Sequence, residues 1–514
     1  MPSPPSPPCS IQLAVLPHPK KKLKTVTTAT THSIRSPSEP QRRPLAQLSD
    51  IPSLTFVKDQ KSGRLRPQRP RVKLRNNLLA AVGYIELANA GDFAANVFNM
   101  RPIPIYAITL MVIGGTVALG MIYFVIKDTR LSWQNIQGLR AERKFLLQAK
   151  QKQVEACNNN KGGRNGGSGR NDDSSARTLE CLLHVNYRDL GAEVIDRLGM
   201  DVLLGCGALM VGAGTYLAMG GEDPVVFDAS NLLTGYIGNS PIAFYGLVNM
   251  GWSAFVWLRA KHHGLAVTAA SGANLDARVK RRLKRRTRRV QLHGMLNGVA
   301  GVVAGAASLV TATHWWAYII LGPCILISGY CNRLWRHHVG YDRPLFMREM
   351  EFTEDEVVEA LKQVDDVLQR IGYQSHVPSA DVEAGLDPIA VLVAESDGSF
   401  RCLLEFIAYM NLFGDFCGRL IGDKKLVSHF CPDISCAVVF DAGKLLAVED
   451  LAVADQLLQM SRDIISQDAR KYLEYREKWL LEVLGCYMAL GSPFKAREED
   501  DDSQTDGAWE VDKS

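Results

Sequence analysis

The sequence of 514 residues lacks the motifs that mark the common catalytic and cofactor sites. It contains no P-loop, GxSxG, HExxH or Rossmann glycine fingerprint, so we expect neither an enzyme nor a bound cofactor. The eleven cysteines form no CxxC pair and show no regular spacing. Because zinc sites and disulfide frameworks both need such spacing, we expect no metal and no disulfide framework.

Charged residues are absent from Gly294 to Cys331. An apolar stretch of this length is about twice what one helix needs to cross a bilayer. Residues 314–316, His-Trp-Trp, divide it near the middle. This pattern predicts two membrane helices within residues 295–334, joined by a tight turn.

Three more apolar stretches have the length of a membrane helix, namely 103–126, 202–220 and 242–258. Apart from Arg333 at the end of the last span, the spans contain no Asp, Glu, Lys or Arg, which argues against an ion-coupled transporter. The sequence therefore predicts an α-helical multi-pass membrane protein of about five spans. It also predicts a C-terminal cytosolic α+β domain and disordered termini.

Lysine and arginine crowd one set of membrane ends, which predicts the orientation of the spans. The rule places the 127–198 loop, with a flexible linker at 161–175, in the cytosol. It places the basic loop 259–293 and the C-terminal region there as well. With five spans, the N-terminal tail is left on the opposite side.

Residues 1–75 form a basic tail rich in proline and serine, for which we expect disorder. Its prolines prevent an amphipathic targeting helix, and no secretory signal is visible. We therefore expect the plasma membrane or an endomembrane rather than the mitochondrial inner membrane. Residues 76–100 predict an amphipathic interfacial helix, because Glu86 and Asp92 oppose membrane crossing.

Residues 340–496 read as the cytosolic α+β domain, followed by an acidic, disordered tail at 497–514. The turn Asp397-Gly398 between two apolar runs predicts a β-hairpin. Another strand is expected at 435–441, and one or two long helices at 447–488.

The densest basic run lies between two predicted spans. Positive charge is required there by topology, and we expect an added contact with anionic lipids but no nucleic-acid binding. The residues concerned are Arg278, Lys280, Arg281, Arg282, Lys284, Arg285, Arg286, Arg288 and Arg289.

Small residues predict where the spans pack. Gly294 and Gly298, then Gly301 and Gly305, stand at GxxxG spacing, which allows close approach of another helix. We expect the span that follows in sequence to be the partner. Asn249, within 242–258, is predicted to form an interhelical hydrogen bond.

Two blocks of the sequence resemble known proteins. They are RNNLLAAVGYIELANAGDFAANVFNMRP at 75–102 and LLEFIAYMNLFGDFCGRLIGDKKL at 403–426. They resemble proteins of filamentous fungi described only as integral membrane proteins, over about residues 75–490. The resemblance implies no activity, cofactor or site residue.

The function expected from these features is that of a non-enzymatic scaffold or interaction protein. Its partners are the lipid bilayer, anionic lipids and a protein that binds the cytosolic domain. The alternative is a small-solute transporter or channel, which a polar cavity between the spans would favour. A membrane-embedded enzyme ranks third, because the spans lack histidine clusters and acidic pairs.

Overall fold

The computed structural model describes most of the chain between residues 53 and 491. The described residues are 53–58, 65–67, 73–76, 78–81, 93, 103–160, 169–220, 222–269, 276–311, 313–345, 354–374, 400–409, 412–430 and 437–491. All of them belong to one compact unit. The disorder predicted for the first fifty residues and for the acidic tail 497–514 lies outside this range and stays a prediction, as does the flexible linker over 161–168. The linker prediction is wrong for 169–175, which form the start of a helix.

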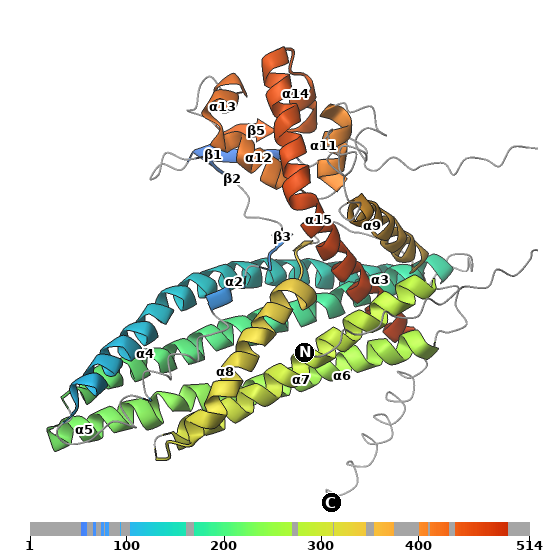
Figure 1. The fold of residues 1–514 in the computed structure, drawn as a ribbon. Coiled ribbons are helices and arrows are strands. Elements are labelled where there is room, and N and C mark those ends of the chain that lie inside the picture. The colour runs from blue at the N-terminus through green and yellow to red at the C-terminus, as the bar shows by residue number, and fades with distance from the viewer. Residues whose placement is uncertain are drawn as a thin grey trace, which may run out of the picture. The chain divides into compact units, whose positions relative to one another are not determined.

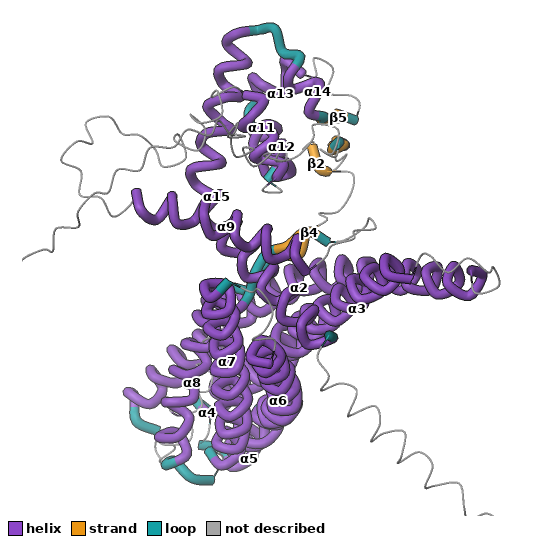
Figure 2. Tube along the Cα trace, turned by 90° about the vertical axis from the view of Figure 1, so that its right-hand side faces the viewer, coloured by secondary structure: helices purple, strands orange, loops and turns teal. Residues whose placement is uncertain are grey.

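The described chain is mostly helical (Figure 2). Its N-terminal part holds three short strands, β1 (Leu54–Lys58), β2 (Leu65–Pro67) and β3 (Lys73–Leu74). The helix α2 (Ile105–Asn160) then runs without a break for 56 residues, from the first apolar stretch into the basic segment that follows. It is followed by α3 (Gly169–Gly191) and a π-helical segment, Ala192–Gly199.

The central part of the chain continues the helical bundle. It contains α4 (Met200–Ala218), α5 (Pro224–Asn231), a π-helical segment Leu232–Ile237, α6 (Asn239–Ala269), α7 (Ala277–Val310), α8 (Ala317–Leu334) and a π-helical turn Trp335–Val339. Figure 1 shows α2, α4, α6, α7 and α8 side by side, and α4 contacts both α2 and α6.

Four helical stretches among the described residues are long and apolar enough to cross a membrane. They are Ile105–Glu155, Pro224–Ala269, Ala277–Val310 and Ala317–Val339. They match four of the five predicted spans and indicate a membrane protein. The predicted span 202–220 forms the helix α4, but this helix is not one of the four. It is short, begins with Asp201 in its first turn, and is extensively buried against its neighbours.

The glycines of α7 face α6, not the helix that follows them in sequence. A Cβ atom built on Gly305 would lie 2.7 Å from the Cα atom of Ala243, and one on Gly298 would lie 2.9 Å from the Cβ atom of Ser253. The partner we predicted for this face is therefore corrected from α8 to α6. The long antiparallel contact of α6 with α7 explains the difference, because it spans the whole GxxxG pattern.

The C-terminal region is helical with very little strand. It comprises β4 (Arg343–Pro344), α9 (Glu354–Gln374), α11 (Phe400–Tyr409), α12 (Phe413–Gly422), α13 (Lys424–Phe430), β5 (Val438–Phe440), α14 (Ala442–Leu446) and the 40-residue α15 (Leu451–Leu490). The strand predicted at 435–441 is confirmed by β5. The second strand of the predicted hairpin is wrong, because Phe400–Tyr409 is a helix with a strongly one-sided apolar face.

The N-terminal strands pair with the C-terminal region. β1 is antiparallel to β5, with Leu54 opposite Phe440, and β3 is antiparallel to β4, with Leu74 opposite Arg343. The prediction of one disordered tail from 1 to 75 is therefore wrong for the three strands β1, β2 and β3. Phe56 supplies the reason, since its buried ring lies edge-on to that of Phe440, with the ring centroids 5.9 Å apart.

Two contacts place the chain after β3 relative to α8. Near the C-terminal end of α8, Asn332 Nδ2 donates to the backbone oxygen of Leu79 at 3.1 Å. Near its N-terminal end, the ring of Tyr318 packs against Phe93, with centroids 5.0 Å apart. Leu79 and Phe93 therefore lie toward opposite ends of α8. The rest of the predicted interfacial helix 76–100 falls largely outside the described residues.

Candidate functional site

A cluster of charged side chains joins the C-terminal region to the helical bundle. Its centre is Glu482 on α15, which is 7% exposed. The helix α15 reaches this position because its apolar residues share one hydrophobic core with α3, α6 and α7. Gly485 allows the close approach, since a Cβ atom there would lie 3.0 Å from His263 Nδ1 on α6. The domain boundary that we predicted at 340 is thus crossed by a continuous core.

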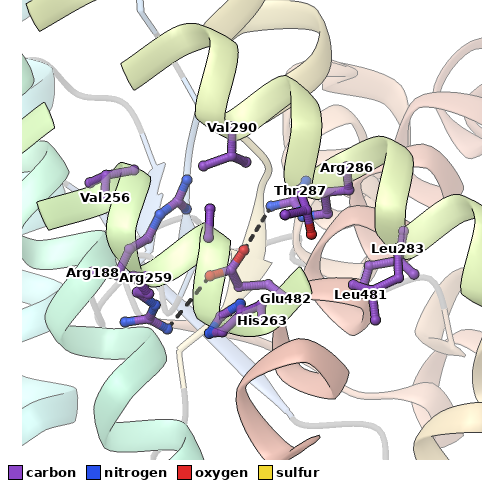
Figure 3. A pocket seen from close by; sticks show the side chains of 11 residues that line it. Arg188, Val256, Arg259, His263, Leu283, Arg286, Thr287, Val290, Leu481 and Glu482 are labelled. Atoms are coloured by element: carbon purple, nitrogen blue, oxygen red, sulfur yellow. Dashed lines mark hydrogen bonds and ion pairs between the residues drawn. The ribbon is translucent and has the colours of Figure 1, made fainter. Parts of the chain in front are cut away.

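Three arginines from three helices surround Glu482 (Figure 3). Arg259 on α6 lies 3.5 Å from Oε1, and Arg286 on α7 donates from Nη2 to Oε2 at 3.3 Å. Arg188 on α3 lines the same pocket, as does His263. We call Arg188, Arg259, His263, Arg286 and Glu482 the Glu482 cluster.

The electrostatics of the Glu482 cluster favour charged forms in spite of burial. Burial alone would raise the pKa of Glu482, but the guanidinium groups of Arg188, Arg286 and Arg259 outweigh it and hold that pKa well below its usual range. Burial opposes the charge on Arg188, yet Glu482 and its neighbours raise the pKa of this guanidinium above its ordinary value. Glu482 and Arg188 therefore both carry their charge at neutral pH.

A second buried ionic group lies beside the first. Arg343 donates to both carboxylate oxygens of Glu142, at 2.7 and 2.8 Å, and from Nε to Asp189 Oδ2 at 2.8 Å. Asp189 also accepts from Arg188 Nη1 at 3.1 Å, so it links the two groups. These contacts tie α2 and α3 to β4 at the start of the C-terminal region.

A pocket opens at the Glu482 cluster. Its volume is about 20 Å³, enough for roughly one water molecule. Four arginine nitrogens of the cluster are buried and have no hydrogen-bond acceptor: Arg188 Nη2, Arg259 Nε and Nη2, and Arg286 Nε. Such an arrangement suits an anionic ligand, because only N–H donors remain to be satisfied. Two neighbouring pockets, of about 10 and 20 Å³, are also lined by Arg188.

The structure separates the predicted basic residues into two sets. Arg286 is buried on Glu482, and Arg282 pairs with Asp365 and with Glu477. Five others are exposed, namely Arg278, Arg281, Lys284, Arg285 and Arg288, while Lys280 and Arg289 are half-buried. Arg282 and Arg286 therefore serve contacts within the chain, and the five exposed residues make a basic face on α7.

The predicted packing residues lie together along α6 and α7. Gly294, Gly298, Gly301 and Gly305 all approach α6, and Asn249 lies opposite Asn297. Among the described residues no group of three or more metal-ligating side chains comes together.

The Glu482 cluster was not among the sites predicted from the sequence. One signal was available: Glu482 is the lone acidic residue in the apolar run WLLEVLGCYM, 479–488, and it requires a cationic partner when buried. Its partners come from three distant segments, which no local pattern connects.

Comparison of the chain with protein-family models, with curated proteins and with solved structures gives no match.

Proposed function

We propose that the protein is a non-enzymatic, multi-pass membrane scaffold that holds its C-terminal region firmly against the cytosolic ends of its spans. The Glu482 cluster is the observation that carries this proposal. A single carboxylate on α15 meets arginines from α3, α6 and α7, within a core that those helices share. A region attached in this way moves with the bundle and offers a fixed surface to a protein partner.

The scaffold has six membrane crossings in this proposal. Four are the apolar stretches described above, and α4 is the fifth, because it lies antiparallel to α2. Tyr216 meets Thr116 at one end of the pair, at 2.7 Å, and Asp201 meets Thr129 at the other, at 3.4 Å.

The sixth crossing is the passage of the chain between Leu79 and Phe93. Leu79 and Phe93 contact opposite ends of α8, at Asn332 and at Tyr318. This crossing replaces the interfacial helix that we predicted from Glu86 and Asp92. An even number of crossings keeps β1 on the same side as β5, as their pairing requires. The sixth crossing replaces our prediction that the N-terminal tail lies opposite the C-terminal region.

The basic face of α7 supports a cytosolic location of the common side. Exposed lysine and arginine next to a span favour the cytosolic side, where anionic lipids are concentrated. Among the five exposed residues of this face, Lys284, Arg285 and Arg288 lie closest to the apolar part of α7. We propose that these three contact anionic lipid head groups and so set the position of the scaffold in the bilayer.

The packing of the spans supports a scaffold over a transporter or channel. Gly246 and Gly301 bring the backbones of α6 and α7 together where a solute path between them would have to run. The three pockets described above lie around Arg188, at one end of the bundle, and hold about one water molecule each.

Reconstitution into vesicles tests both parts of the proposal. We expect spin-labelled phosphatidylserine to be immobilised by the protein more than spin-labelled phosphatidylcholine. The substitutions Lys284→Gln, Arg285→Gln and Arg288→Gln together should remove most of that preference. The matched control replaces three exposed lysines far along α2, Lys144, Lys150 and Lys152, and should keep it.

The same vesicles decide between scaffold and transporter. The vesicles are loaded with labelled small solutes and with indicators for protons, sodium, potassium and chloride. If the protein is a scaffold, vesicles that contain it should be no more permeable than protein-free vesicles. Solute flux that depends on the protein would contradict the scaffold and favour the alternative.

A further inference from the structure

The pocket at the Glu482 cluster has more donors than acceptors. Arg188 Nη2, Arg259 Nε and Arg286 Nε are buried without an acceptor, and all three side chains line the pocket. Arg188 and Arg286 are only 3% and 6% exposed, so solvent does not compensate for the missing bonds. Buried N–H groups of a guanidinium are costly unless something accepts from them.

The charges at the pocket are also unequal. Three arginines face the single carboxylate of Glu482. A second carboxylate, that of Asp189, accepts from Arg188 but also from Arg343, so it is shared between them. Asp196 is the next carboxylate, but it accepts from Trp252 Nε1 at 2.9 Å and lines the neighbouring pocket. The local surplus is therefore positive.

We propose that the Glu482 cluster binds one phosphate group. Guanidinium groups recognise phosphate through paired, charge-assisted hydrogen bonds, and three of them converge here. With a volume of about 20 Å³, the pocket admits roughly one phosphate oxygen. The rest of the group stays at the mouth, where Arg259 donates from Nη1 to the backbone oxygen of His184 in an exposed position.

The phosphate has two conceivable sources, a phospholipid head group and free inorganic phosphate. Val256 lines the pocket and belongs to the apolar stretch of α6, so the site lies where the spans meet the head-group layer. Basic pockets between membrane helices bind lipid head groups at this level. The lipid source rests on the proposed membrane arrangement, whereas binding of inorganic phosphate does not.

The experiment measures the unfolding temperature of the full-length protein in a neutral detergent. One arm adds sodium phosphate against sodium chloride at equal ionic strength, and the other adds phosphatidic acid against phosphatidylcholine in the micelles. With the ligand at a concentration of about ten times its dissociation constant, we expect the unfolding temperature to rise by about 2 to 4 °C in at least one arm. A response to phosphatidic acid alone assigns the lipid source, and a response to phosphate assigns the free anion.

Two variants show that the response comes from this site. Arg259→Gln, at the mouth, should abolish most of the rise, whereas the exposed Arg462→Gln on α15 should keep it. Glu482→Gln removes the competing carboxylate and should enlarge the rise. If Arg259→Gln does not fold, native mass spectrometry can compare the wild-type protein with Glu482→Gln. We then expect Glu482→Gln to retain more phosphate or phosphatidic acid than the wild-type protein.

Three results would overturn the inference: no response in either arm, an equal response to chloride, or an unchanged response in folded Arg259→Gln. Failure of the vesicle experiments above would leave an inorganic phosphate response intact, so the two proposals can fail separately.

Discussion

Asn249 on α6 and Asn297 on α7 exchange hydrogen bonds across the helix pair. Asn249 Nδ2 donates to the backbone oxygen of Asn297 at 3.0 Å, and Asn297 Nδ2 donates to Asn249 Oδ1 at 3.0 Å. The amides fix the register of the two helices, and Gly246, Gly298 and Gly301 allow the approach that the bonds require. Side-chain amides in apolar surroundings hold helices together in this way.

The first prediction concerns the glycine face of α7. Gly301→Leu and Gly305→Leu should each destabilise the protein by at least about 2 kcal/mol, because overpacking forces two backbones apart. At Gly305 even a Cβ atom would lie 2.7 Å from the Cα atom of Ala243. The unfolding temperature and the folded yield in detergent measure the effect. Val303→Leu, at an exposed position of the same helix, should behave like wild type. Equal behaviour of the glycine and valine variants would refute the α6–α7 contact.

The second prediction concerns the pairing of β1 with β5. Phe56→Ala should destabilise the C-terminal region by about 3 kcal/mol, because it removes a buried ring packed on Phe440. Protease sensitivity of the α11–α14 segment, Phe400–Leu446, should rise accordingly. The adjacent Val57→Ala, at an exposed site of the same strand, should have an effect below about 0.5 kcal/mol. A similar protease pattern in both variants would mean that the N-terminal strand does not support this region.

The third prediction concerns pH. Burial lowers the pKa of Lys73 and that of Lys478 from the ordinary 10.5 to about 8. Between about pH 8 and 10 the unfolded chain binds more protons at these lysines than the folded chain, so stability rises with pH. The gain should approach about 1 kcal/mol per pH unit for each lysine. Below pH 8 both states are protonated and the dependence disappears.

Denaturant midpoints at pH 8.0, 8.5, 9.0 and 9.5 check this dependence. A double variant, Lys73→Met with Lys478→Met, should lose the rise. The range stops short of pH 10, because burial raises the pKa of Tyr475 to about 12 and that of Tyr472 further, so stability falls again once unfolded tyrosines ionise. A flat profile for the wild-type protein would show that the two lysines keep their ordinary pKa.

Much of the bundle could be predicted from local patterns. Long uncharged stretches correspond to helices of membrane length, and the spacing of Gly294, Gly298, Gly301 and Gly305 marked a close contact. Both signals lie within one helix, so a single sequence reveals them. The partner of the glycine face was not predictable in this way, because GxxxG spacing is equally compatible with any neighbouring helix.

The contacts between distant segments could not be predicted. Leu54 pairs with Phe440, and Arg343 reaches Glu142, across hundreds of residues. A three-residue strand such as β5 has no periodicity of its own, and its partner β1 lies in a stretch whose composition resembles a disordered tail. The role of Arg286 could not be predicted for the same reason. Its position in a basic run suggested a contact with lipid, but its side chain points inward and pairs with Glu482.

The central claim is that an even number of crossings puts β1 and the C-terminal region on one side of the membrane. The most direct measurement attaches a short fragment of a split fluorescent protein to Met1, to Ser514 or within the short loop at Glu222 and Asp223, and expresses the complementary fragment in the cytosol. We expect fluorescence for both terminal fusions and none for the loop fusion, which should respond only to a complement on the other side of the membrane. Fluorescence of the Ser514 fusion but not of the Met1 fusion with the cytosolic complement would contradict the account and restore an odd number of crossings.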